Sequence, residues 1–247
     1  MDSPDINGFP PLGSMRRLPP PSRQTRPFML PQQLFPDFFG EGGDRETLLV
    51  AIPTRGTVFT GTLESVFRNI DEASIDFDFE FTTKPIPIGF NELFEIGRRK
   101  GSTYIWLVED DMVMPPKCLS LLLNLVRDIG FDLSVPHYPL DTKSCHLETK
   151  DDEVLWGGTG CLLVKTESLE RMSQPFFSTE FSFDKDLRKN KSAASKKWGG
   201  QDVYFYRNAI DSGLHIGVAP IRCSQLRLEA LGDHADNHGL HKIRKIT

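Results

Sequence analysis

The stretch that decides the fold is Thr103-Tyr104-Ile105-Trp106-Leu107-Val108-Glu109-Asp110-Asp111-Met112-Val113-Met114-Pro115-Pro116. Residues 104–108 form a short apolar run rich in aromatic and β-branched side chains, which is typical of a strand buried on both faces. Three carboxylates follow at once, and the proline pair suits the first turn of a helix. The acids are therefore predicted at the carboxyl end of a central strand, where open α/β sheets bind their ligands.

The acidic triplet itself predicts a metal site. Adjacent carboxylates repel one another, and a bound cation is the simplest way to offset that repulsion. Mg²⁺ or Mn²⁺ is typically held by one or two carboxylates, with substrate phosphates and water as the other ligands. A solvated acidic turn is the alternative interpretation, but the position directly after a buried strand favours the metal.

Composition limits the class of protein. A chain of 247 residues is long enough for one large domain or two small ones, and its net charge of −5 implies no general attraction to nucleic acid or membrane. Cys118, Cys145, Cys161 and Cys223 are widely spaced without a C-x-x-C pair, so their spacing predicts neither a zinc site nor a disulfide framework. Without an apolar run of roughly 20 residues or a signal-peptide core, we expect a protein of the reducing cytoplasm.

The domain organisation follows from where regular patterns begin. Residues 1–46 are rich in proline and phenylalanine without periodicity, so we expect an extended arm whose second half packs on the main domain. An arm that binds a partner is the alternative. The main domain is predicted over 47–225, and 226–247 form a C-terminal tail that can close over the active site.

Strands and helices alternate through the first half of that domain. Strands are predicted at 48–52, 77–81, 103–108 and 131–135. Helices are predicted between them, the first capped by Thr60 or Thr62, the second at 89–100 and the third ended by Gly130. This order predicts an α/β fold with a mostly parallel central sheet flanked by helices.

The second half is less regular. We expect a loop or hairpin at 137–152, a glycine turn at 156–160 and a strand at 161–164. A short helix capped by Thr166, a long polar loop to 197, a helix from Trp198 to Gly213 and a last strand at 215–218 follow.

The order of these motifs resembles GT-A glycosyltransferases that use nucleotide sugars, closest in style to the large family-two group. The resemblance covers roughly 47–225 and rests on the combined order and spacing of the motifs. They are Ile52-Pro53-Thr54-Arg55, Gly89-Phe90-Asn91-Glu92-Leu93, Glu109-Asp110-Asp111, Gly157-Gly158 and Trp198-Gly199-Gly200-Gln201-Asp202 with Gly213.

The resemblance implies a site for a nucleoside-diphosphate sugar. Pro53, Thr54 and Arg55 would line the nucleotide base. Asp78 or Glu80 would meet the base or ribose. The other donor-binding residues that the resemblance implies are Asn91, Glu109 and Asp110, the two acids lying by the ribose and sugar.

The resemblance also implies the chemical roles. Asp111 matches the last acid of the D-x-D motif and would bind the Mn²⁺ or Mg²⁺ that bridges the diphosphate. Asp202 matches the general base of inverting members, and a simple helix cap is the alternative. The residues near the acceptor and diphosphate would be Gly157, Gly158, Trp198, Gly199 and Gly200.

Two positions depart from the family pattern. Members often carry a Cys-x-His whose histidine completes the metal site, whereas this chain has Cys223-Ser224-Gln225. His234 or His238 could supply that ligand from the tail. Gln201 stands where many members have an acid, so a transfer that retains configuration stays open.

Positive charge is concentrated just before Trp198. Residues 184–197 contain six basic and two acidic residues, a net charge of +4, among them Lys189, Lys191, Lys196 and Lys197. We therefore hypothesise a polyanionic acceptor such as hydroxymethylated viral DNA, with a glycan or a lipid phosphate as alternatives. A nucleotidyltransferase and a catalytically inactive binding module are the other function classes that the sequence leaves open.

Overall fold

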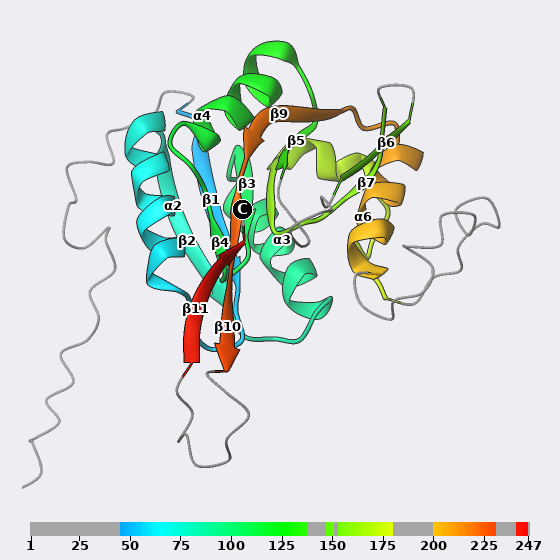
Figure 1. The fold of residues 1–247 in the computed structure, drawn as a ribbon. Helices are drawn as coiled ribbons and strands as arrows, with labels where there is room; N and C mark the ends of the chain where they lie inside the picture. The colour runs from blue at the N-terminus through cyan, green and yellow to red at the C-terminus, as the bar shows by residue number, and fades with distance from the viewer. Residues whose placement is uncertain (1–44, 138–146, 151–152, 180–199, 231–240, 247) are drawn as a thin grey trace, which may run out of the picture. The chain divides into compact units, whose positions relative to one another are not determined.

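The computed structural model describes residues 45–137, 147–150, 153–179, 200–230 and 241–246 (Figure 1). All of them belong to one compact unit, Asp44–Thr247. The predicted N-terminal arm lies almost entirely outside the described residues. Among the helices that are described, none combines the length and apolarity needed to cross a bilayer.

A six-stranded sheet forms the centre of this unit. Its strands, in spatial order, are β2 (Asp76–Thr82), β1 (Thr47–Pro53), β3 (Tyr104–Val108), β8 (Cys161–Lys165), β5 (Leu133–His137) and β9 (Ile216–Arg222). Strand β8 runs antiparallel to both of its neighbours, and the other adjacent strands pair in parallel. The predicted α/β fold with a mostly parallel central sheet is confirmed.

Helices cover both faces of the sheet, as Figure 1 shows. On one face lie α2 (Thr60–Ala73) and α4 (Cys118–Leu123), which continues as a π-helical turn over Asn124–Ile129. On the other lie α3 (Ile88–Lys100) and α6 (Gly200–Asp211). Strand β3 is buried along its whole length because its side chains alternate between these two cores.

The predicted N-terminal caps of two helices are wrong, whereas Gly130 ends the third helix as predicted. The residue before α2 is Phe59, and no side chain caps this helix. The hydroxyl of Thr62 instead donates to the backbone carbonyl of Asp110 (3.0 Å), which also accepts from the Phe59 amide (3.0 Å). The helix start is thus held by the acidic turn. Thr166 likewise begins a 3₁₀ helix (Thr166–Arg171) rather than capping it.

The second half contains two further sheets. A hairpin forms from β6 (Leu147–Lys150) and β7 (Glu153–Gly157), so its second strand lies beyond the loop or hairpin expected at 137–152 and includes residues 156–157 of the expected glycine turn. A three-stranded sheet, absent from the sequence prediction, joins β11 (His241–Ile246), β10 (Ser224–Ala230) and β4 (Met112–Val113). Strand β10 continues across the predicted boundary at residue 225 and brings the C-terminal segment to the acidic turn.

Candidate active site

The acidic triplet lies where β3 ends beside the start of β8. The Glu109 amide donates to the Gly160 carbonyl (2.9 Å), and the Met112 amide donates to the Glu109 carbonyl (3.1 Å), which closes a tight turn. Such a turn points successive side chains in different directions. The three carboxyl groups consequently have three different environments.

Asp110 is neutralised by Arg55. Its Oδ2 accepts from the Arg55 backbone amide (3.0 Å), and its Oδ1 accepts from the Arg55 guanidinium (3.1 Å). The Asp110 side chain is 8% exposed and the Arg55 side chain is 80% exposed, so Arg55 lies on the solvent side of the pair. Asp110 therefore joins the loop after β1 to the loop after β3, and both of its oxygens already have donors.

Asp111 keeps one oxygen without a partner. Gln225 Nε2 donates to Oδ2 (3.2 Å), and the Arg55 guanidinium lies 3.6 Å from the same oxygen. The other oxygen, Oδ1, is buried and has no hydrogen-bond partner among the described residues. Burial, and then the charge of Asp110, raise the pKa of Asp111. A buried carboxylate oxygen without a donor is the kind of atom that a cation satisfies.

Gln225 occupies the position where the resemblance places a histidine. It reaches Asp111 because β10 pairs with β4 directly after the acids, with Gln225 opposite Met112. The Leu226 amide also donates to the Asp111 carbonyl (2.7 Å). Gln225 therefore lies within hydrogen-bonding distance of Asp111.

Asp202, which is buried, and Glu109, which is half-buried, form a second pair of carboxyl groups. Asp202 lies in the first turn of α6, and Thr159 Oγ1 donates to its Oδ1 (2.6 Å). Burial raises the pKa of Asp202 to about 7. Burial, then the charges of Asp202 and Asp111, raise the pKa of Glu109 to about 8. Glu109 thus lies within electrostatic reach of both Asp111 and Asp202.

The predicted glycine turn connects these groups. Gly157 and Gly158 are buried, and the Gly158 carbonyl accepts from the Tyr206 hydroxyl (3.3 Å), one turn along α6 from Asp202. A Cβ at Gly160 would approach Met112 Sδ to 3.3 Å and Glu109 Oε2 to 3.4 Å. The turn therefore packs closely against the acids and helps to fix α6 beside them.

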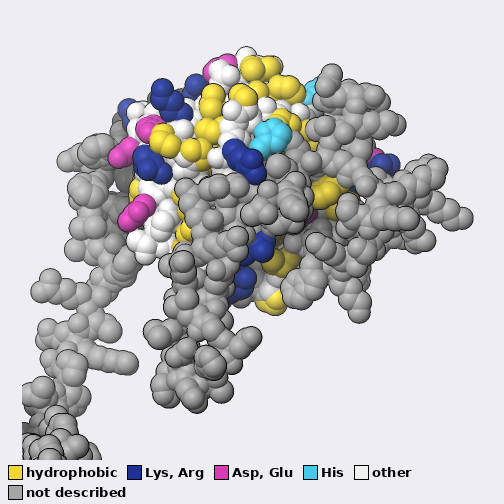
Figure 2. Space-filling view, viewed as in Figure 1, with side chains coloured by type: hydrophobic (Ala, Val, Ile, Leu, Met, Phe, Trp, Pro, Cys, Tyr) yellow, Lys and Arg dark blue, Asp and Glu magenta, His cyan; other side chains and the backbone are white. Residues whose placement is uncertain are grey.

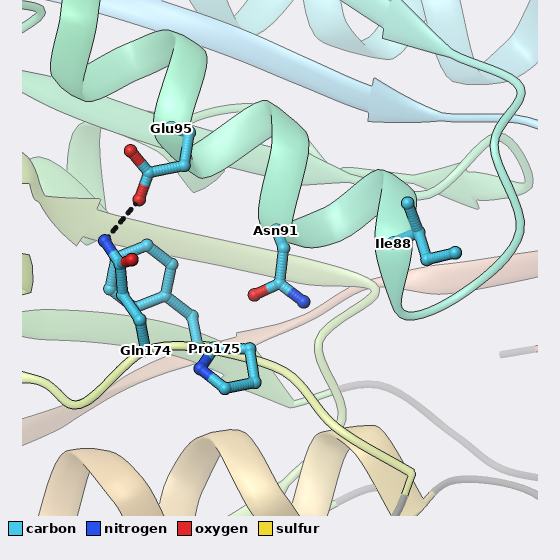
Figure 3. A pocket seen from close by; sticks show the side chains of 6 residues that line it. Ile88, Asn91, Glu95, Gln174 and Pro175 are labelled. Atoms are coloured by element: carbon cyan, nitrogen blue, oxygen red, sulfur yellow. Dashed lines mark hydrogen bonds between the residues drawn. The ribbon is translucent and has the colours of Figure 1, made fainter.

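Asn91 binds backbone groups of Pro87 and Phe177 and lines a different part of the molecule from the acidic triplet. Its Nδ2 donates to the carbonyls of Pro87 (3.1 Å) and Phe177 (2.8 Å), and its Oδ1 accepts from the Phe177 amide (3.0 Å). It lines a cavity of about 410 Å³ between α3 and residues 174–176, where Gln174 bonds to Glu95 (Figure 3). None of the acidic triplet lines that cavity.

The remaining predicted donor residues have local partners. Thr54 bonds to Thr82 through its amide (2.9 Å) and to the Thr57 carbonyl through its hydroxyl (2.7 Å), in the loop that follows Pro53. Asp78 and Glu80 form ion pairs with Lys100, at 3.3 Å and 2.9 Å.

Several candidate residues lie outside the described part of the chain. They are Trp198, Gly199, Lys189, Lys191, Lys196, Lys197, His234 and His238. On the face that Figure 2 shows, the described Lys and Arg side chains are interspersed with Asp, Glu and hydrophobic ones. The basic segment that motivates the acceptor hypothesis, residues 184–197, lies outside the described part of the chain.

No protein-family model matches this sequence, and no curated protein matches it. Among solved structures, A197 from STIV superposes with a TM-score of 0.51 at 17% identity, covering 80% of this chain and 100% of that one. The inositol-1-phosphate CTP transferase from T. maritima gives 0.43 at 12% identity, covering 74% and 88%. CMP:2-keto-3-deoxy-manno-octonic acid synthetase complexed with CTP gives 0.46 at 10% identity, covering 72% and 90%.

These likenesses concern the fold. At such identities they carry no residue roles from the neighbours to this chain. The fold is an α/β fold with a mixed, mostly parallel sheet flanked by helices, similar to that of A197 from STIV.

Proposed function

We propose that this chain is a metal-dependent glycosyltransferase that moves a sugar from a nucleoside diphosphate to a hydroxyl acceptor. One observation carries the proposal. A buried carboxylate oxygen without a donor, on Asp111, lies at the same strand end as a buried carboxyl group with a pKa near neutrality, on Asp202. Glu109 lies within electrostatic reach of both. Asp111 would then bind a cation, and Asp202 would accept a proton.

The acids fit a single divalent cation held chiefly by Asp111. Gln225 holds Oδ2 and leaves Oδ1 for the metal, while Arg55 already neutralises Asp110. Mn²⁺ or Mg²⁺ bound there would offset the charge that builds on a departing diphosphate. The exposed Arg55 guanidinium, 3.6 Å from Asp111, would add a second positive charge beside the same phosphates.

Asp202 fits the role of general base. In the reaction, the bond between the sugar and the diphosphate breaks, the acceptor oxygen bonds to the sugar, and the acceptor proton passes to the Asp202 carboxylate. A base is most effective when its pKa lies near the working pH, and that of Asp202 is about 7. The 2.6 Å bond from Thr159 holds one carboxyl oxygen and so orients the other.

Glu109 fits a supporting role. With a pKa of about 8, Glu109 keeps its proton at neutral pH, and Asp202, with a pKa of about 7, is only partly ionised, so the pair carries less than one negative charge rather than two. Arg55 pairs with Asp110. Of the three adjacent acids, only Asp111 therefore needs a cation, and the cation would bind its oxygen Oδ1.

The acceptor in this proposal is a polyanion, and hydroxymethylated DNA is the specific candidate. It is supported by the net charge of +4 over residues 184–197, directly before the helix that carries Asp202. Clamping a diphosphate needs one or two cations, whereas this segment contains six. A glycan or lipid phosphate with a hydroxyl group would satisfy the same charges.

The test compares two reactions on the same protein. With Mn²⁺, we expect slow hydrolysis of one sugar nucleotide to sugar and nucleoside diphosphate. We expect no release of nucleoside triphosphate when pyrophosphate is supplied. Asp202→Asn should lower transfer by about 10²- to 10⁴-fold with little change in donor affinity. Pyrophosphorolysis without hydrolysis would assign the chain to the nucleotidyltransferases instead.

A further inference from the structure

Three cysteines that are far apart in the sequence meet in the core. Cys118 begins α4, Cys161 begins β8 and Cys223 lies between β9 and β10. All three are fully buried, and their Sγ atoms all lie within 4.8 Å of one another. None of them is in a disulfide. The spacing of these cysteines in the sequence gives no sign of the cluster, because the order of the strands in space brings them together.

We propose that Cys118, Cys161 and Cys223 bind one thiophilic cation of the Zn²⁺ type as a structural site. In a tetrahedral site with Zn–S bonds of about 2.3 Å, the sulfur atoms lie about 3.8 Å apart. The Sγ atoms of Cys118 and Cys223 are 3.7 Å apart, which fits that edge and is too long for a disulfide. Among the described residues no fourth Cys, His, Asp or Glu joins the cluster, so the proposed site has three thiolates.

The indole of Trp106 is a second observation that points to a thiolate. Its N–H is buried and makes no hydrogen bond of ordinary geometry among the described residues. It lies beside Cys161 in the same core cluster. A buried donor facing a neutral thiol would be poorly satisfied, whereas N–H groups beside metal-bound sulfur orient and stabilise the ligand.

The site would hold together the segments that flank the acids. Cys161 follows Gly160, whose carbonyl accepts from the Glu109 amide. Cys223 precedes the Gln225 that bonds to Asp111. A cation bound to both cysteines would fix the start of β8 and the start of β10 relative to the acidic turn. Binding replaces the three thiol protons with one divalent cation, so protons are released as the site fills.

The direct test is the metal content of the protein purified without chelator. We expect about one equivalent of Zn²⁺ per chain. Added Cd²⁺ cannot reach the buried sulfur atoms in the folded protein, so the protein is also unfolded and refolded in the presence of Cd²⁺. The sulfur-to-cadmium charge-transfer absorption of the refolded protein should then report three thiolates. Both measurements use the unaltered chain, so they do not depend on whether a variant folds.

Variants then assign the ligands. Cys161→Ala should lower Cd²⁺ affinity by at least about 100-fold and reduce the charge-transfer absorption, because only two thiolates remain. Met114→Leu is the matched control, because it removes a buried sulfur from the same core without removing a thiolate, and it should keep the metal. A wild-type protein that purifies and refolds without metal, with all thiols free or with a disulfide, would overturn the proposal. So would an unchanged Cd²⁺ spectrum in Cys161→Ala.

Discussion

Thr159 Oγ1 donates a 2.6 Å hydrogen bond to Asp202 Oδ1, and both side chains are buried. The bond joins the glycine turn before β8 to the first turn of α6. It also favours the charged form of a carboxyl group that burial otherwise keeps protonated. The same contact therefore positions the proposed base and sets the pH at which it loses its proton.

Thr159→Val should shift the pH dependence of transfer. Without the hydroxyl, the pKa of Asp202 rises further. The rising limb of the pH–activity profile, near pH 7 in the wild type, should therefore shift to a pH about one unit or more higher. The measurement is kcat/KM for transfer from pH 5.5 to 9.5. Thr159→Ser keeps the donor and serves as the control, and a limb at the same pH in all three proteins would contradict the role of this bond.

Asp202→Asn should make the protein more stable at alkaline pH. The native carboxyl has a pKa of about 7, above its unfolded value of 3.8, so the folded chain holds a proton that the unfolded chain has released. Wild-type stability is therefore lost as pH rises from about 4 to about 7. The difference from Asp202→Asn, measured by urea unfolding, should be small at pH 4 and on the order of 4 kcal/mol at pH 8. If the difference in the free energy of unfolding between the two proteins did not depend on pH, burial would not raise the pKa of Asp202.

Gln225→His should strengthen the metal site. Gln225 Nε2 already lies 3.2 Å from Asp111 Oδ2, so an imidazole at this position could reach a cation bound by Asp111. We expect Mn²⁺ to bind about tenfold more tightly, as judged by titration calorimetry. Gln225→Leu offers no ligand and should not tighten binding. Equal affinity in the histidine variant and the wild type would place the cation away from Gln225.

The polyanionic acceptor predicts a steep dependence on salt. On duplex DNA, log affinity should fall with log salt with a slope of roughly −0.9 per neutralised phosphate. The slope should flatten when four lysines of the basic segment become Ser: Lys189, Lys191, Lys196 and Lys197. A charge-matched control changes four lysines elsewhere: Lys84, Lys100, Lys117 and Lys165. Salt-independent binding, or equal slopes in the two variants, would remove nucleic acid as the acceptor.

The central sheet was predictable because burial on both faces leaves long apolar runs. The run 104–108 and the strand near 48–52 have that pattern, and both were found within two residues of their observed bounds. Strand β10 was missed because residues 226–247 were assigned to a tail, although its alternating residues are typical of a strand, and β4 because it has only two residues. The predicted N-terminal cap of α2 was wrong because tertiary contacts with Asp110 replace local capping there.

The chemical states of the acids could not be read from the sequence. Glu109, Asp110 and Asp111 are equivalent neighbours in the chain, and only Arg55, from the loop after β1, makes Asp110 different. The resemblance marked Gln225 only as a departure from the family pattern and did not predict its contact with Asp111. No pattern signalled the partnership of Thr159 with Asp202.

The most direct test of the central claim measures Mn²⁺-dependent binding of a panel of UDP, GDP, ADP, CDP and TDP by calorimetry. Wild type should bind one of them only when Mn²⁺ is present. Asp111→Asn should weaken that binding by about 100-fold or more while its melting temperature is retained, because the only buried oxygen proposed for the metal is replaced. Asp128→Asn, an exposed acid after α4, is the control and should bind as wild type does. Equal Mn²⁺-dependent binding by Asp111→Asn, or no binding of any diphosphate by the wild type, would contradict the account.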